Sequence, residues 1–152
     1  MDEEVAVEPM NVERMENIPN HAIFGWGSAS QGQLGLGPSG EDTVLQPILI
    51  PSLQDEEIAT VACGQSHTLF VTKEGKMYSC GSNDYGQKGQ NISNSKPELV
   101  NIMEEQVIKQ VAAGARHSMA MTDTGQVFCW GDNSNGQVGR NNMEESHTAS
   151  PK

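Results

Sequence analysis

The stretch Ile58–Gly89, IATVACGQSHTLFVTKEGKMYSCGSNDYGQKG, decides the fold, because the chain repeats it about fifty residues later. The second copy, Ile108–Gly139, reads IKQVAAGARHSMAMTDTGQVFCWGDNSNGQVG and aligns with the first without a gap. A partial third copy, FGWGSASQGQLG at Phe24–Gly35, lies upstream. Self-similarity at a period of this size is the signature of an array of supersecondary units, and we expect such an array here.

The recurring positions are mostly glycines, joined by a histidine, an asparagine and a glutamine. Glycine permits positive φ and close backbone approach, so its recurrence indicates tight turns and close packing. We interpret the whole set as structural. Its members are Gly27, Gly32, Gln33 and Gly35 in the partial copy, Gly64, His67, Gly75, Gly81, Asn83, Gly86, Gln87 and Gly89 in the first full copy, and Gly114, His117, Gly125, Gly131, Asn133, Gly136, Gln137 and Gly139 in the second.

Short apolar runs separated by turn residues, with no helical period, predict an all-β meander. Glycine at 75 and 125 predicts tight turns with positive φ between successive strands. Alternation places His67, Leu69 and Val71 on one strand face and Thr68, Phe70 and Thr72 on the other. Because both faces are partly apolar, we expect this strand to pack between neighbouring sheets. The expected strands are 22–27, 46–51, 58–63, 67–72, 77–80, 96–100, 107–113, 117–122 and 127–130.

Three regions follow from this pattern. Residues 1–20 are acidic and lack any period, which predicts a disordered leader. Residues 21–140 hold the repeats, with core segments at about 22–37, 58–89 and 108–139. Residues 141–152 resemble the start of another inter-repeat loop, a truncated loop or tail in which no further strand is expected.

Composition excludes several functions. The 152-residue chain has a formal net charge of −11, which argues against a direct nucleic-acid surface. No apolar run is long enough to predict a membrane span. An odd cysteine count without a signal peptide or CxxC pair indicates reduced thiols and a cytoplasmic location, with the nucleus as the alternative.

Catalytic and ligand-binding interpretations find no support in the residues. The glycine-rich loop 28–40 lacks the Lys-Ser/Thr ending of a phosphate-binding loop, and its Gly-Gln phrase recurs in every unit. Cys63 and His67 have ligand-like spacing, but Ala113 replaces the cysteine in the next copy. We expect each repeat histidine to hydrogen-bond backbone inside its own unit. The sequence therefore predicts no enzyme, no metal and no cofactor.

The phrases Ala-x-Gly-x-x-His-Ser/Thr and Cys/Trp-Gly-x-Asn-x-x-Gly-Gln-x-Gly closely resemble the repeat of the regulator of chromosome condensation family. The resemblance covers about residues 22–140 and implies a seven-bladed β-propeller. At about fifty residues a blade, the chain supplies about two and a half blades, so we expect a partial propeller with exposed sheet edges and marginal stability.

The N-terminal arrangement, with Trp26-Gly27, Cys80-Gly81-Ser82-Asn83 and Lys96-Pro97-Glu98, resembles the small HERC-type ubiquitin ligases. This likeness implies a non-enzymatic module that binds substrate or regulator proteins through loops at the blade rims. The ligase domain would lie outside the chain. The alternative that the family implies is a guanine-nucleotide exchange factor for the small GTPase Ran or a chromatin-associated regulator. The expected partners are proteins, of the ubiquitin pathway or the small GTPases.

Two hypotheses concern contacts between blades. The recurring glutamines are expected to bridge backbone groups of adjacent turns through their side-chain amides. Trp26, Cys80 and Trp130 share one phase of the repeat and are expected to fill an inter-blade position.

Overall fold

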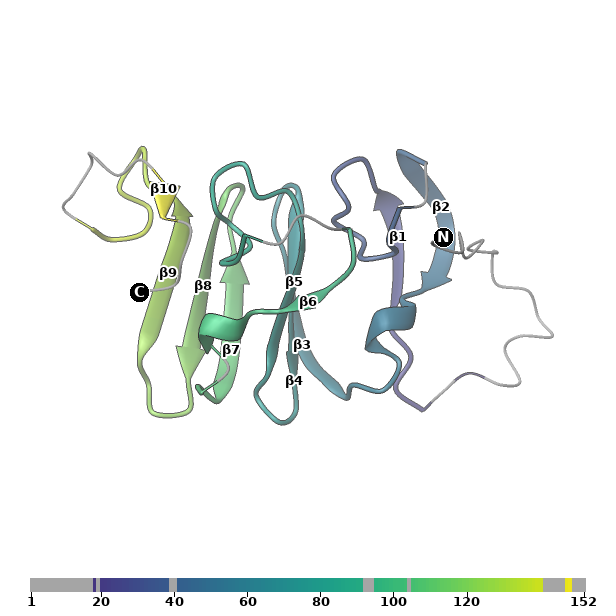
Figure 1. The fold of residues 1–152 in the computed structure, drawn as a ribbon, viewed down its shortest axis with the longest axis horizontal. Coiled ribbons are helices and arrows are strands. Elements are labelled where there is room, and N and C mark those ends of the chain that lie inside the picture. The colour runs from purple at the N-terminus through teal and green to yellow at the C-terminus, as the bar shows by residue number, and fades with distance from the viewer. Residues whose placement is uncertain are drawn as a thin grey trace.

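Three antiparallel sheets follow one another along the molecule in chain order (Figure 1). The structure, a computed structural model, describes Ile18 and residues 20–38, 41–91, 95–103, 105–140 and 147–148. We name the sheets blade 1 (β1–β2), blade 2 (β3–β6) and blade 3 (β7–β10). The strands are β1 Phe24–Ser28, β2 Thr43–Leu49, β3 Ile58–Cys63, β4 His67–Thr72, β5 Met77–Gly81, β6 Glu98–Leu99, β7 Ile108–Ala113, β8 His117–Thr122, β9 Val127–Asp132 and β10 His147–Thr148, with short 3₁₀ helices at Pro51–Leu53 and Asn101–Met103.

The hairpins of blades 2 and 3 are built in the same way. The tight turn between β4 and β5 contains Gly75, whose φ is 86° and whose N–H donates to the Thr72 carbonyl at 2.9 Å. Gly125, at φ 85°, repeats this geometry between β8 and β9. Each blade also has a register shift at the start of its first strand, at Ile58/Thr60 and at Ile108/Gln110. The repeat in the sequence is therefore a repeat in backbone structure.

Strand β4 packs into two hydrophobic cores at once, as its two-sided apolar pattern predicts. All six of its residues are buried. Leu69 and Val71 belong to the core between blades 2 and 3, together with Ile108 and Trp130. Phe70 belongs to the core between blades 1 and 2. A strand that is apolar on both faces therefore fixes blade 2 between its neighbours.

Blade 3 corrects one expectation. We expected no strand after residue 140, but β10 pairs with β9, His147 opposite Asp132 and Thr148 opposite Gly131. In blade 2 the same outer edge is paired by β6, where Glu98 lies opposite Ser79. An unpaired strand edge presents free backbone donors and acceptors, and a short extended segment satisfies them. Blade 3 therefore has four strands, and the described residues form a partial β-propeller of two four-stranded blades and one two-stranded sheet.

The predicted leader, 1–20, lies outside the described residues except for Ile18 and Asn20. The predicted tail, 141–152, lies outside them except for β10. In the part of the chain that the structure describes, no helix has the length and apolar character needed to cross a membrane.

Candidate interaction site

The Gly-Gln-x-Gly loops share one internal design. In the loop after β5, the Gln87 side chain accepts a hydrogen bond from the Tyr85 N–H at 2.9 Å. Asn83 accepts from the Lys88 N–H at 3.0 Å and donates to the Gln90 carbonyl at 2.7 Å. The other two loops repeat the glutamine contact. The Gln33 side chain accepts a hydrogen bond from the Gln31 N–H, and the Gln137 side chain accepts one from the Asn135 N–H. Each recurring glutamine thus shapes its own loop.

Blade 2 is joined to blade 3 by the main-chain carbonyl of Gln87. This oxygen accepts hydrogen bonds from the Ser118 hydroxyl at 2.8 Å and from the Trp130 indole N–H at 2.9 Å. The hypothesis that the side-chain amide bridges adjacent blades is therefore wrong. The amide is hydrogen-bonded within the loop, to the Tyr85 N–H and the Ser82 hydroxyl, and the main-chain carbonyl makes the contact with the next blade.

The same contact recurs between blades 1 and 2. The Gln33 carbonyl accepts from the Thr68 hydroxyl at 2.7 Å and lies 3.5 Å from the Cys80 sulfur. Thr68 and Cys80 occupy the positions that Ser118 and Trp130 occupy in the following blade. Each of the two contacts therefore joins one main-chain carbonyl of a loop to two donor side chains of the following blade. We call this arrangement the inter-blade hydrogen-bond unit.

The inter-blade position was predicted correctly for Cys80 and Trp130, which are fully buried. For Trp26 the prediction is wrong, because its side chain is 61% exposed. Its counterparts Cys80 and Trp130 contact the preceding blade. None of the described residues supplies a blade before blade 1, which lies at one end of the row of sheets (Figure 1).

His67 also links two blades, which corrects the expectation of a backbone partner within its own blade. Its Nε2 lies 2.8 Å from the Ser118 hydroxyl of blade 3. Since that hydroxyl donates to the Gln87 carbonyl, its oxygen accepts the Nε2 proton. Burial, with a smaller contribution from His117, lowers the pKa of His67 to about 4. The imidazole is a neutral structural donor, because a charged ring at this buried place would be strongly disfavoured.

The repeated glycines divide into two groups. Gly64 and Gly114 leave room for an imidazole: a Cβ on either would lie 2.2 or 2.1 Å from Cε1 of His67 or His117, respectively. The others have positive φ: Gly27, Gly32, Gly35, Gly75, Gly81, Gly86, Gly89, Gly125, Gly131, Gly136 and Gly139.

A side-chain pair at the loop end of the blades provides the best candidate for protein recognition. Arg116, in the β7–β8 loop, donates to the Tyr85 hydroxyl at 2.8 Å, and its guanidinium lies 4.6 Å from the Tyr85 ring centroid. Asp84 is exposed beside this pair, and Ser134 and Asn135 are exposed on the equivalent loop of blade 3. Tyr and Arg are the residue types that most often dominate protein interfaces. We call these five residues the loop-end surface.

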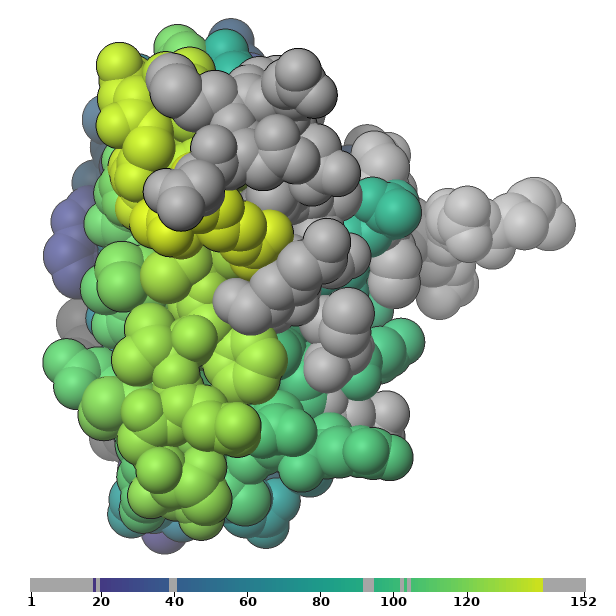
Figure 2. All heavy atoms as spheres, turned by 90° about the vertical axis from the view of Figure 1, so that its left-hand side faces the viewer, coloured from purple at the N-terminus to yellow at the C-terminus, as the bar shows by residue number. Residues whose placement is uncertain are grey.

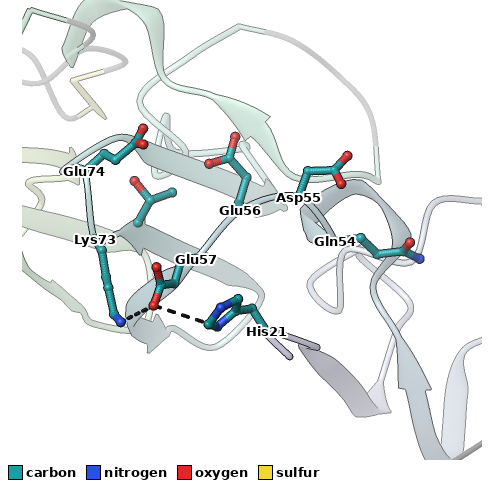
Figure 3. Close-up of a pocket in the computed structure, with 8 residues that line it drawn as sticks. His21, Gln54, Asp55, Glu56, Glu57, Lys73 and Glu74 are labelled. Carbon is teal, nitrogen blue, oxygen red and sulfur yellow. Dashed lines mark hydrogen bonds and ion pairs between the residues drawn. The ribbon is translucent and has the colours of Figure 1, made fainter. Parts of the chain in front are cut away.

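A pocket of about 280 Å³ lies at the opposite end, near the β4–β5 turn (Figure 3). Its lining is acidic, with Asp55, Glu56, Glu57 and Glu74. Glu57 pairs with Lys73, and this hydrogen bond holds the pKa of the carboxyl below its usual value. No cluster of three metal-ligating side chains was found among the described residues. These contacts show surface ion pairing.

Cys80 and Cys129 also lack the surroundings of a nucleophile. Burial raises the pKa of Cys80 to about 12 and raises that of Cys129. Cys63 is exposed, and all three are free thiols. A thiol whose pKa is raised stays protonated at neutral pH and is a poor nucleophile.

The local role of Gln87 leads to a first prediction. Gln87→Ala removes the acceptor of the Tyr85 N–H and should lower the free energy of unfolding by about 1–3 kcal/mol. Chemical denaturation measures the loss, with Gln137→Ala as the matched control, because Gln137 holds its loop alike but none of the described residues donates a hydrogen bond to its main-chain carbonyl. If the free energy of unfolding falls equally in the two variants, the contact between blades 2 and 3 does not contribute to the effect of Gln87→Ala.

The buried imidazole leads to a second prediction. The pKa of His67 is about 4 in the folded protein and about 6.5 when exposed, so the unfolded state binds its proton more tightly. The stability that neutral His67 supplies is therefore complete above pH 6.5 and falls as the pH drops toward 4. We expect about 2 kcal/mol to be lost between pH 6.5 and about pH 5. Denaturation across this range should show a shallower pH dependence for His67→Gln, and equal slopes would count against the assignment.

Comparison with known proteins identifies the class to which this fold belongs. Residues 58–87 and 108–137 match one family model, and residues 20–71, 74–121 and 124–152 match a second, both described as the regulator of chromosome condensation (RCC1) repeat. The chain belongs to the RCC1 repeat family. It is a protein-interaction repeat module of the β-propeller type.

Two curated relatives and one solved structure match parts of this chain. The chain is 47% identical over 73 residues to the probable E3 ubiquitin-protein ligase HERC4 of Rattus norvegicus, a match that covers 48% of this chain and 7% of the relative. It is 41% identical over 70 residues to the X-linked retinitis pigmentosa GTPase regulator of Canis lupus familiaris, covering 46% and 7%. The crystal structure of Prp20p from Saccharomyces cerevisiae, reported with its binding properties to Gsp1p and histones, matches with a TM-score of 0.73 and 28% identity, covering 95% of this chain and 37% of Prp20p. The matched part is thus a small fraction of each curated relative.

Proposed function

We propose that this chain binds a substrate or regulator protein for a HERC-like ubiquitin ligase, using its loop-end surface. The likeness to HERC4, at 47% identity over 73 residues, is the observation that carries the proposal. The loop-end surface supports it, because Tyr85 and Arg116 differ from their counterparts Asn135 and Ser66 while the scaffold around them repeats. Residues that differ between the repeats are not required by the shared scaffold and can serve recognition.

A capture experiment tests this proposal. Tagged chain is incubated with cell extract, and bound proteins are quantified by mass spectrometry. The test variant, Tyr85→Asn with Arg116→Ser, carries the residues of the sister repeats and so keeps side chains that the fold accommodates. The control, Asp123→Ala with Thr124→Ala, changes exposed residues of the β8–β9 turn at the other end of the blade.

The wild-type chain and the control should both enrich ubiquitin-pathway proteins, and the test variant should lose them by about tenfold or more. Enrichment that survives in the test variant would move recognition away from the loop-end surface. Absence of ubiquitin-pathway proteins from the wild-type capture would refute the HERC-like role.

A guanine-nucleotide exchange factor or chromatin-associated regulator is the second candidate. It is favoured by the match to Prp20p, which covers 95% of this chain, and by the reported binding of Prp20p to Gsp1p and histones. The direct test is the release of labelled nucleotide from the small GTPase Ran with increasing concentrations of the chain. Faster release would support exchange activity, and an unchanged rate at saturating concentration would reject it.

A further inference from the structure

The chain contains two tyrosines, Tyr78 and Tyr85, whose hydroxyl groups lie in opposite electrostatic surroundings. The Tyr78 hydroxyl donates to the Glu56 carboxylate at 2.5 Å, and burial together with this carboxylate raises the pKa of Tyr78. The Tyr85 hydroxyl instead accepts a hydrogen bond from the Arg116 guanidinium at 2.8 Å. An anionic group added to the phenol oxygen would therefore be repelled at Tyr78 and attracted at Tyr85.

The contact between Tyr85 and Arg116 joins two blades. The main chain of Arg116 is fixed in blade 3, because its carbonyl accepts from the Asp132 N–H at 2.9 Å. The main chain of Tyr85 is fixed in the blade 2 loop, because its N–H donates to the Gln87 side chain at 2.9 Å. Figure 2 looks at the molecule from the blade 3 end, with the green and yellow-green atoms of blade 3 in front of blade 2. A stronger bond between the two side chains would thus tie one blade to the next.

Neither side chain of this contact belongs to the repeated scaffold. Tyr85 stands where the first loop has Gln31 and the third has Asn135. Arg116 stands where blade 2 has Ser66. Two departures from the repeat therefore meet at a single blade junction.

The guanidinium is already placed for a phosphate on the Tyr85 oxygen. It lies 4.6 Å from the ring centroid and also donates to the hydroxyl, so it borders the ring and its oxygen at once. A guanidinium carries five N–H donors in a planar fork, which matches the oxygens of a phosphate. A phosphoryl group on this oxygen would present three strong acceptors to Arg116.

We propose that Tyr85 is a phosphorylation site and that Arg116 holds the phosphate, which locks the blade 2 loop onto blade 3. A tyrosine kinase supplies the phosphoryl group from ATP. The Tyr85 oxygen forms a bond to the γ-phosphorus, the bond from that phosphorus to ADP breaks, and the hydroxyl proton is released. Tyr85 is half-buried in the loop between β5 and β6. Since a kinase takes its substrate as an extended segment, this loop opens locally for the transfer and closes afterwards.

The first experiment treats the folded 152-residue chain with ATP and each of a panel of purified tyrosine kinases. Mass spectrometry quantifies both tyrosines. Modification of Tyr85 should exceed that of Tyr78 by about tenfold or more, because Tyr78 lies in β5 between two paired strands, where opening costs more free energy. Equal modification of the two tyrosines, or a Tyr85 that no kinase of the panel modifies, would overturn the proposal.

Thermal unfolding tests whether Arg116 holds the phosphate. The wild-type chain phosphorylated at Tyr85 should melt about 3 °C or more above the unmodified chain. The same modification should leave the melting temperature of Arg116→Ser unchanged or lower it, because the phosphate then adds to the net charge of −11 and to the neighbouring Asp84 without a partner. Arg116→Ser carries the residue of the sister repeat, so the fold accommodates it. Arg116→Lys keeps the charge but loses the planar fork, and should recover part of the rise. An equal shift in the wild-type chain and Arg116→Ser would refute the role of Arg116.

Protection of the phosphate gives an independent measurement. A purified tyrosine phosphatase should release phosphate from the wild-type chain about fivefold more slowly than from Arg116→Ser. Sodium chloride at about 1 M should narrow this difference by screening the ion pair. Equal release rates at low salt would contradict the proposed contact. No binding partner enters these measurements, so their outcome is independent of the function proposed above.

Discussion

Trp130→Ala will lower the free energy of unfolding by about 3–5 kcal/mol, the range for truncating a fully buried large side chain. The indole is 0% exposed and lies in the core between blades 2 and 3 with Leu69 and Ile108. The variant leaves a cavity there and also removes the indole donor from the Gln87 carbonyl. Chemical denaturation followed by circular dichroism measures the loss.

The chain supplies a matched control for this change. Trp26 occupies the same repeat phase at 61% exposure, so Trp26→Ala should change stability by only about 0.5 kcal/mol. Similar losses in the two variants would show that burial between blades is not the source of the effect.

The strands could be predicted because they depend on local signals. Alternation along β4 and the turn residues Thr72–Gly75 locate the hairpin without knowledge of any distant contact. The prediction failed at β10, because a two-residue strand has too little sequence to show a pattern and is selected by the open edge of β9. It failed at Trp26 because the repeat phase gives the orientation of a side chain but does not say whether a neighbouring blade is present.

The inter-blade contacts were only partly predictable. The recurrence of glutamine gave the correct positions at Gln33 and Gln87, but the bridging atom is the main-chain oxygen, which every residue carries and no sequence distinguishes. The partner of His67 was missed for a related reason, since Ser118 is contributed by another unit and becomes adjacent only when blades stack.

The Tyr85–Arg116 contact was missed as a pair, although each residue gave a signal. Tyr85 differs from its counterpart Asn135, and Arg116 differs from Ser66. Departure from the repeat is thus the signal that the sequence offers at both positions. Only the stacking of blade 3 beside blade 2 brings the two loops together.

Gly81→Ala tests whether close approach, rather than backbone conformation alone, requires the repeated glycines. Gly81 has a φ of 102°, and a Cβ there would lie 2.4 Å from the Ser66 carbonyl oxygen and 2.7 Å from the His67 Cα. Both are backbone atoms of the adjoining strand and loop, so relief requires the sheet itself to move. We expect the free energy of unfolding to fall by about 3–4 kcal/mol, the sum of the costs of left-handed strain and of overpacking.

Gly27→Ala separates these two costs. Gly27 has nearly the same conformation, with a φ of 107°, but a Cβ there would meet nothing within 4 Å. The free energy of unfolding of this variant should therefore fall only by the conformational cost, about 1–2 kcal/mol. Gly131→Ala, with a φ of 104° and a Cβ 2.5 Å from the Arg116 carbonyl oxygen, should behave like Gly81→Ala. If all three losses are equal, φ alone explains the recurrence of glycine; if Gly81 and Gly131 lose more than Gly27, the recurrence is set by the packing of each strand end against the preceding loop.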